Sequence, residues 1–178
     1  HCAEELAMLN AEIPEIKEIP TIRFHEAKQI MEEKFGHKSK NRYDLNPDEE
    51  VLLCQWAKEE HDSDFVFVTH FPSAKRPFYA KDDPEDPKLA LSFDLLFRGL
   101  EITTGGQRIH DYQEQMDKLA ARKMNAELFE SFTMLHKYGM PPHGGLGIGL
   151  ERLTMQLLKL NNIREASMFP RDMNRLEP

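Results

Sequence analysis

The sequence is poor in cysteine, in tryptophan and in long apolar runs. Its 178 residues include one tryptophan and two cysteines, Cys2 and Cys54. No Cys-x-x-Cys pair occurs, so neither a zinc site nor a disulfide framework is predicted. No apolar stretch approaches the length of a membrane span, so we expect no membrane anchor. No signal peptide follows His1, and we expect a cytoplasmic protein whose sequence begins inside a longer natural chain.

The chain also lacks a surplus of positive charge. Lysine and arginine number 23 against 31 acidic residues, which gives a formal net charge of -8. Small basic clusters at residues 38–42 and 118–123 are typical of solvated surface. Because nucleic-acid binding requires a basic patch, most contacts with any bound RNA should lie outside this chain.

Periodicity and turn residues predict an α+β class, with an antiparallel sheet flanked by helices in a single domain over residues 1–178. The strands cluster and are joined by a hairpin at Arg98-Gly99 and by helical pairs, without regular βαβ alternation. Strands are expected at residues 64–70, 90–97 and 100–104, with 76–79 and 144–149 extended. Helices are expected at 1–10, 24–35, 46–60, 111–122 and 125–137, and along a leucine stripe from 150 to 160.

The first candidate site lies on Gly99–Arg108, where a glutamate, a threonine and an arginine surround two glycines. Glu101 could bind Mg²⁺, and Arg108 has the fork geometry that suits a carboxylate or phosphate. An edge strand with solvent-facing charges also fits the pattern. Glu101 and Arg108 are seven residues apart, so a regular strand would place them on opposite faces. A shared site therefore predicts a bulge between Thr103 and Gly106.

The second candidate is the glycine-rich segment His143–Arg152. It lacks the Gly-Lys-Ser/Thr of a P-loop and reads as a strand that feeds a helix. The start of that helix favours anions, and Arg152 in its first turn suits a phosphate, although an exposed arginine on a core helix fits too. Asp94 could share a metal ion with Glu101 or belong to an unrelated surface pair. Tyr79 could line the same pocket or the core.

These residues resemble a known family. Gly144–Leu153 resembles motif 3 of class II aminoacyl-tRNA synthetases, and Gly99–Arg108 resembles a strand of the aspartate enzymes of the archaeal and eukaryotic branch. The resemblance covers nearly all of the chain and includes the segments Phe71–Ser73, Arg76–Tyr79, Phe93-Asp94, Tyr138–Gly145 and Phe169–Asp172.

Close relatives of these enzymes can be separated on two segments. Asparaginyl enzymes tend to carry Ser-Val-Pro-His-Ser-Gly at the position of Gly139–Gly144 and Phe-Pro-Arg-Thr at the position of Phe169–Asp172. Both differences favour aspartate. An aspartyl-synthetase-like asparagine synthetase and a non-catalytic, synthetase-like binding module remain alternatives.

The resemblance implies ATP-dependent activation of L-aspartate and its transfer to tRNA(Asp), with ATP and Mg²⁺ as cofactors. Arg108 would bind the side-chain carboxylate of aspartate, with Thr104, Tyr79 and His143 in the same pocket. Glu101 and Thr104 would hold Mg²⁺ on the phosphates of ATP, with Asp94 at a further ion. Arg152 would bind the terminal phosphate and act in catalysis with Glu101. The ATP wall would consist of Gly149, Leu150, Glu151 and Arg152.

The family also has parts that have no counterpart in this sequence. These are motif 1, which forms a homodimer, motif 2, whose arginine binds the α-phosphate, and an anticodon-binding OB-fold. The resemblance therefore implies that most tRNA contacts lie outside residues 1–178 and that this chain alone is weakly active or inactive.

Overall fold

A five-stranded sheet forms the centre of the molecule. The structure is a computed structural model, and it describes residues 1–177. The strands lie in the order β1-β2-β3-β4-β5. Their bounds are β1 Thr21–Arg23, β2 Phe65–Thr69, β3 Ser92–Phe97, β4 Leu100–Arg108 and β5 His143–Ile148. β1 pairs parallel with β2 and every other pair is antiparallel, so the predicted α+β fold is confirmed with one parallel pair at its edge.

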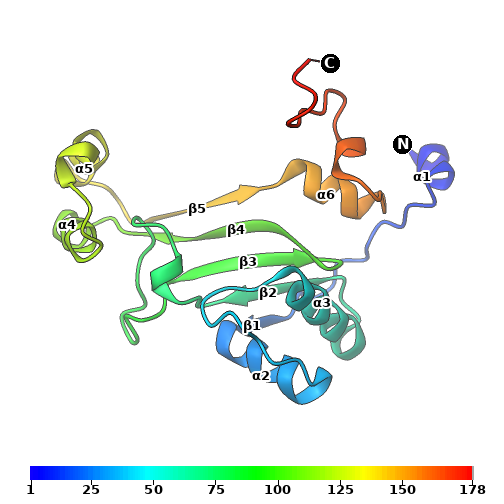
Figure 1. Ribbon diagram of the computed structural model, residues 1–178, viewed down its shortest axis with the longest axis horizontal. Helices are drawn as coiled ribbons and strands as arrows, with labels where there is room; N and C mark the ends of the chain where they lie inside the picture. Colours follow the sequence, from blue (N-terminus) through cyan, green and yellow to red (C-terminus); the bar gives the residue numbers. More distant parts are fainter. Residues whose placement is uncertain (178) are drawn as a thin grey trace.

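Helices cover both faces and one end of this sheet (Figure 1). α2 and α3 lie against one face, α6 lies on the other, and α4 and α5 stand together at one end. The α-helices are α1 Ala3–Met8, α2 Phe24–Phe35, α3 Pro47–His61, α4 Tyr112–Ala121, α5 Glu130–Lys137 and α6 Leu150–Leu157. The 3₁₀ helices are η1 Ser73–Lys75, η2 Ala126–Phe129 and η3 Ile163–Ala166.

Most predicted elements agree with these bounds, and the differences have local causes. The helix expected over residues 125–137 is split, because Asn125 caps a 3₁₀ turn before α5 begins. The helix expected to extend to residue 160 is shorter, because α6 ends at Leu157. The segment around Arg76 was expected to be extended, but it follows the 3₁₀ turn η1 directly and runs into a turn.

Local chemistry explains the start of α3. The Asn46 side chain accepts a hydrogen bond from the Glu49 N–H at 3.0 Å, and the Glu49 carboxylate accepts one from the Asn46 N–H at 2.9 Å. Pro47 occupies the first helical position, where its lack of an N–H has no cost. These reciprocal bonds satisfy donors that a helix start leaves unpaired, so the predicted start is confirmed.

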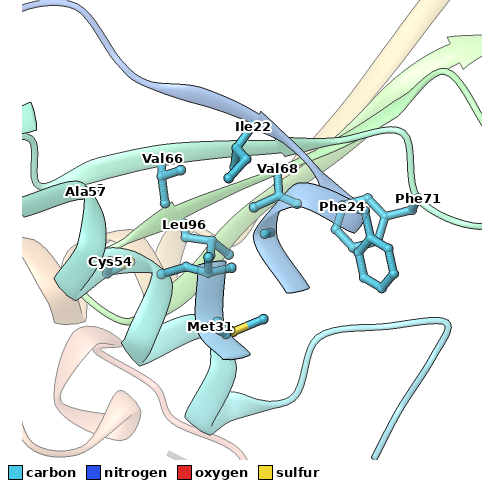
Figure 2. Packing of buried hydrophobic residues seen from close by; sticks show 11 residues of the cluster. Ile22, Phe24, Met31, Cys54, Ala57, Val66, Val68, Phe71 and Leu96 are labelled. Atoms are coloured by element: carbon cyan, nitrogen blue, oxygen red, sulfur yellow. The ribbon is translucent and has the colours of Figure 1, made fainter. Parts of the chain in front are cut away.

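The main hydrophobic core lies between the sheet and α2 and α3 (Figure 2). Val66 and Val68 alternate along β2 and point toward the helices together with Leu96 of β3. A smaller cluster of Phe65, Phe97 and Ile102 packs on the opposite face against α6. The sheet is therefore anchored on both faces at the end where β4 begins.

Within residues 1–177, every helix is too short or too polar to traverse a bilayer.

Candidate active site

A bulge in β4 places the predicted site residues on one face of the sheet. Thr103 pairs with Leu95 of β3, but Glu101 pairs with the next residue, Leu96, so Ile102 is extra. Side chains normally alternate between the two faces of a strand. Because the extra residue interrupts this alternation, Glu101 and Arg108 point to the same face of the sheet. The predicted bulge is confirmed, but its predicted position was wrong by one residue.

The glycines that were expected to form the bulge have a different role. A Cβ added to Gly106 would lie 2.6 Å from the Leu91 carbonyl oxygen, and one added to Gly105 would lie 2.7 Å from the Phe93 ring. Both positions therefore require glycine because neighbouring chains approach so closely. Ile102 makes the bulge instead, and its side chain is buried among Phe97 and the leucines of α6.

A cavity of about 280 Å³ lies at the far end of this face. Its walls include Arg76, Tyr79, Thr104, Arg108 and Gly145. The Arg108 guanidinium stacks over the Tyr79 ring, with its central carbon 4.9 Å from the ring centre. It also lies against the bare backbone of Gly145, where an added Cβ would be 2.7 Å from a guanidinium nitrogen. The cavity has room for a small anionic molecule beside one fixed guanidinium.

Arg76 organises one wall of this cavity, a role that its place in the sequence does not predict. Its guanidinium donates to both oxygens of Asp94, at 3.1 and 2.8 Å, and to the hydroxyl oxygen of Thr104 at 3.1 Å. Thr104 in turn donates its hydroxyl hydrogen to Asp94 at 2.6 Å. The hydroxyl thus has a fixed direction, and a lone pair on its oxygen stays available. Arg76 itself stacks on Phe71 at 3.8 Å.

Arg152 and Glu101 meet next to this network. The Arg152 guanidinium donates to the Glu101 carbonyl oxygen at 2.9 Å and lies 3.5 Å from its carboxylate. The Gly149 N–H donates to the Ile102 carbonyl oxygen at 2.8 Å, which fastens the start of α6 to the bulge. The helix start and Arg152 are thereby held over Glu101. Glu101 and Arg152 lie outside the cavity that Thr104 and Arg108 line.

The Glu101 carboxylate is partly buried between charges of both signs. Burial raises its pKa, and the nearby charges of Asp94 and Glu50 raise it further, while Arg152 and Arg76 act in the opposite direction. Within residues 1–177, no three histidine, cysteine or carboxylate side chains converge on one metal position. Mg²⁺ needs just one or two carboxylates when waters and phosphate oxygens complete its shell, so Glu101 with the Thr104 oxygen fits this ion.

The remaining predicted residues are divided between two surfaces. Tyr79 lines the cavity with Arg108. His143 is the strand partner of Arg108, but it lines an adjoining hollow with Phe93, and its ring nitrogen lies 3.0 Å from the Pro141 carbonyl oxygen. At the start of α6, Leu150 and Glu151 are exposed.

The resemblance to class II synthetases rests on three features: the sheet, its arginine-bearing face, and the glycine-rich strand with the helix that follows it. The model of a family described as "tRNA synthetases class II (D, K and N)" matches residues 1–173, and the chain belongs to this family. Its relatives include the "Aspartate–tRNA(Asp/Asn) ligase" of Deinococcus radiodurans, 50% identical over 98% of this chain and 41% of that protein. The "Aspartate–tRNA(Asp) ligase" of Pyrococcus furiosus is 38% identical over 100% and 41%.

Solved structures agree with this assignment. The aspartyl-tRNA synthetase of Entamoeba histolytica matches with a TM-score of 0.87 and 34% identity, over 94% of this chain and 34% of that chain. The asparaginyl-tRNA synthetase of Pyrococcus horikoshii, complexed with asparaginyl-adenylate, matches with a TM-score of 0.78 and 36% identity, over 90% and 36%. The resemblance to class II aspartyl-tRNA synthetases is confirmed, and the chain spans about 41% of the length of its curated relatives.

Proposed function

We propose that the chain binds aspartate and ATP as part of an aspartate–tRNA ligase, which forms aspartyl-adenylate and transfers aspartate to tRNA(Asp). One observation carries the proposal. The bulge at Ile102 brings Glu101, Thr104 and Arg108 to one face, with the Arg108 guanidinium fixed in a small cavity. A strand with solvent-facing charges would need neither the bulge nor the glycine contact that holds this guanidinium.

Arg108 would recognise the side chain of aspartate. Its paired N–H groups match a carboxylate in geometry and charge, and its stacking on Tyr79 limits the directions in which it can point. Thr104 would accept a hydrogen bond from the substrate amine or contact the ion, because its own hydrogen is committed to Asp94. The cavity would therefore bind the amino acid, and the surface at Glu101 would bind the nucleotide.

Glu101, through Mg²⁺, and Arg152 beside it would hold the phosphates of ATP. Mg²⁺, when bound, would supply positive charge to the phosphate oxygens, and Glu101 with Thr104 would hold it, with Asp94 at a further ion. Arg152 would contact the terminal phosphate beside the start of α6, along a wall formed by Gly149, Leu150, Glu151 and Arg152. The α-carboxylate of aspartate would attack the α-phosphorus and release pyrophosphate, so no protein nucleophile is needed. These residues position the reactants and neutralise charge.

Partners of the whole protein follow from its relatives. We propose that residues 1–178 form one domain, the C-terminal portion of a catalytic domain, and that the full-length protein is a homodimer. The net charge of -8 supports tRNA contacts that lie mainly outside these residues. Relatives named for tRNA(Asp) alone and relatives named for tRNA(Asp/Asn) both match, so either specificity fits this chain.

Pyrophosphate exchange tests the proposed reaction. The protein at its full natural length is assayed with ATP and either aspartate or asparagine, and we expect exchange with aspartate alone. Exchange that depends on asparagine would favour an asparaginyl enzyme, whose fold is also similar. If Arg108→Ala keeps the exchange activity of the wild type with both amino acids, the cavity does not bind the amino acid. A protein that exchanges with neither amino acid would favour a non-catalytic module.

A further inference from the structure

The bulge in β4 is held in place by a residue from a different layer of the fold. At the bulge the backbone N–H of Glu101 donates to the Glu50 carboxylate at 2.7 Å, across 51 residues of sequence. Glu50 lies in the first turn of α3, on the face of the sheet that carries the site. The sequence gives no sign of this contact, because nothing local marks Glu50 among the acids of that helix start.

Both backbone polar groups of Glu101 are bonded to charged side chains. Glu50 accepts from its N–H, and Arg152 of α6 donates to its carbonyl oxygen at 2.9 Å. The two side chains come from helices on opposite faces of the sheet. Because the main chain of Glu101 is fixed from both sides, the direction in which its carboxylate leaves the strand is fixed too.

The helix that carries Glu50 is itself firmly seated. Leu53 and Ala57 on the following turns are fully buried in the main core. The neighbouring turn of the hairpin passes so close that a Cβ added to Gly99 would lie 3.1 Å from a Val51 methyl group. The Glu50 side chain is partly buried, and its carboxylate accepts the hydrogen bond from the Glu101 N–H. Burial raises the pKa of Glu50, whereas this hydrogen bond and the charge of Arg152 lower it. A well-packed helix thus places this acceptor at the bulge.

We propose that Glu50 is a positioning residue for the nucleotide side of the site: it fixes the bulge and thereby aims Glu101 at the ion on the phosphates. This inference rests on the proposed function. It assigns Glu50 no contact with substrate.

Kinetics separate this role from a general effect on folding. In the protein at its full natural length, Glu50→Ala removes the acceptor, Glu50→Gln keeps an oxygen at the same place, and Glu49→Gln is the matched control. Glu49 is the adjacent residue and is fully buried, but it pairs with Lys28 and does not touch β4. The readouts are the Mg²⁺ concentration for half-maximal pyrophosphate exchange, and the KM values for ATP and aspartate.

Glu50→Ala should raise the Mg²⁺ requirement and the ATP KM about 10- to 100-fold, the effect of one lost hydrogen bond to a charged group, while aspartate KM stays nearly constant. Glu50→Gln should recover most of this loss. Glu49→Gln should lower the melting temperature without moving either value. An unchanged Mg²⁺ requirement in Glu50→Ala, or an equal shift in Glu49→Gln, would overturn the proposal.

A second measurement tests the position of Glu50 without any enzyme assay. It remains informative if the protein shows no pyrophosphate exchange, a result that would contradict the proposed function but not the contact. Amide hydrogen exchange at Glu101, measured in the protein at its full natural length, reports directly on the contact. The proposal requires that Glu50→Ala exposes this amide to exchange and that Glu49→Gln leaves it protected. Equal protection in both variants would show that Glu50 does not hold the bulge.

Discussion

The contact between Gly145 and Arg108 allows the amino-acid pocket to be disturbed without any change of charge. In Gly145→Ala, the new methyl group would lie 2.7 Å from one guanidinium nitrogen and 2.9 Å from the central carbon of Arg108. Ordinary van der Waals contact begins at 3.4 Å, so the guanidinium must move by about 0.7 Å. The end of a flexible side chain can make this shift, so the fold should survive.

The displacement predicts a specific loss of aspartate recognition. Misplacing a binding group by about 1 Å can cost on the order of 100-fold in rate, which corresponds to about 2.7 kcal/mol. We therefore expect kcat/KM for aspartate to fall by roughly 10- to 100-fold, with less effect on the KM for ATP, because the shift is slightly smaller than that distance. The melting temperature should change little.

Gly147→Ala is the control on the same strand. A Cβ added to Gly147 meets no atom within 4 Å, so this variant adds the same methyl group to β5 without touching Arg108. Pyrophosphate exchange at varied aspartate and varied ATP gives kcat and both KM values for each variant. If Gly145→Ala and Gly147→Ala have the same kcat/KM for aspartate, Arg108 does not bind the amino acid in this position.

Substitutions at Arg108, Lys28 and Glu101 give further tests. Arg108→Ala should cost roughly 2–5 kcal/mol in aspartate binding and Arg108→Lys should also be poor, since an ammonium lacks the paired donors; an unchanged aspartate KM would make Arg108 a surface residue. Lys28→Met removes the cation that pairs with the buried Glu49 carboxylate and should lower the free energy of unfolding at neutral pH by about 3–5 kcal/mol in chemical denaturation. Burial raises the pKa of Glu49, but hydrogen bonds from Lys28, Ser39 and Asn46 outweigh this effect and lower the pKa overall. The ion pair of Lys28 and Glu49 therefore stabilises the fold above the ordinary glutamate pKa. The stabilities of Lys28→Met and the wild type should converge as the pH falls below that value. The pKa of Glu101 is raised, so ionisation of its carboxylate costs stability as the pH rises. In Mg²⁺-free buffer, Glu101→Gln should have the melting temperature of the wild type at pH 4 and a higher one at pH 8. Equal melting temperatures at both pH values would contradict the raised pKa.

Local signals in the sequence were sufficient for most of the helices and strands. The start of α3 rests on Asn46, Pro47 and Glu49, which lie within four positions of one another. The hairpin at Arg98-Gly99 needs two residues with positive φ, and both have it, at 49° and 91°. Features of this kind depend on neighbouring residues, which is why their pattern predicts them.

The site required information that no local pattern holds. The odd spacing of Glu101 and Arg108 predicts that the strand must be irregular, but the position of the bulge depends on the burial of Ile102 against α6 and on Glu50. Arg76 lies in the segment Arg76–Tyr79, which carries part of the family resemblance, but its partner Asp94 is 18 residues away. His143 was placed by its nearness to the glycines, and the side of the sheet it lines could not be read from that spacing.

The extra residue in β4 also has a consequence for changes in chain length. A strand with a bulge carries one residue more than its partner requires, so removing one residue between Glu101 and Thr104 would restore regular pairing with β3 and keep both in phase with Arg108. Insertion of one residue at the same place would put Glu101 out of phase with Arg108 unless a second irregularity absorbed it. This strand should therefore accept a deletion more readily than an insertion, at the expense of the Ile102 side chain that packs against α6.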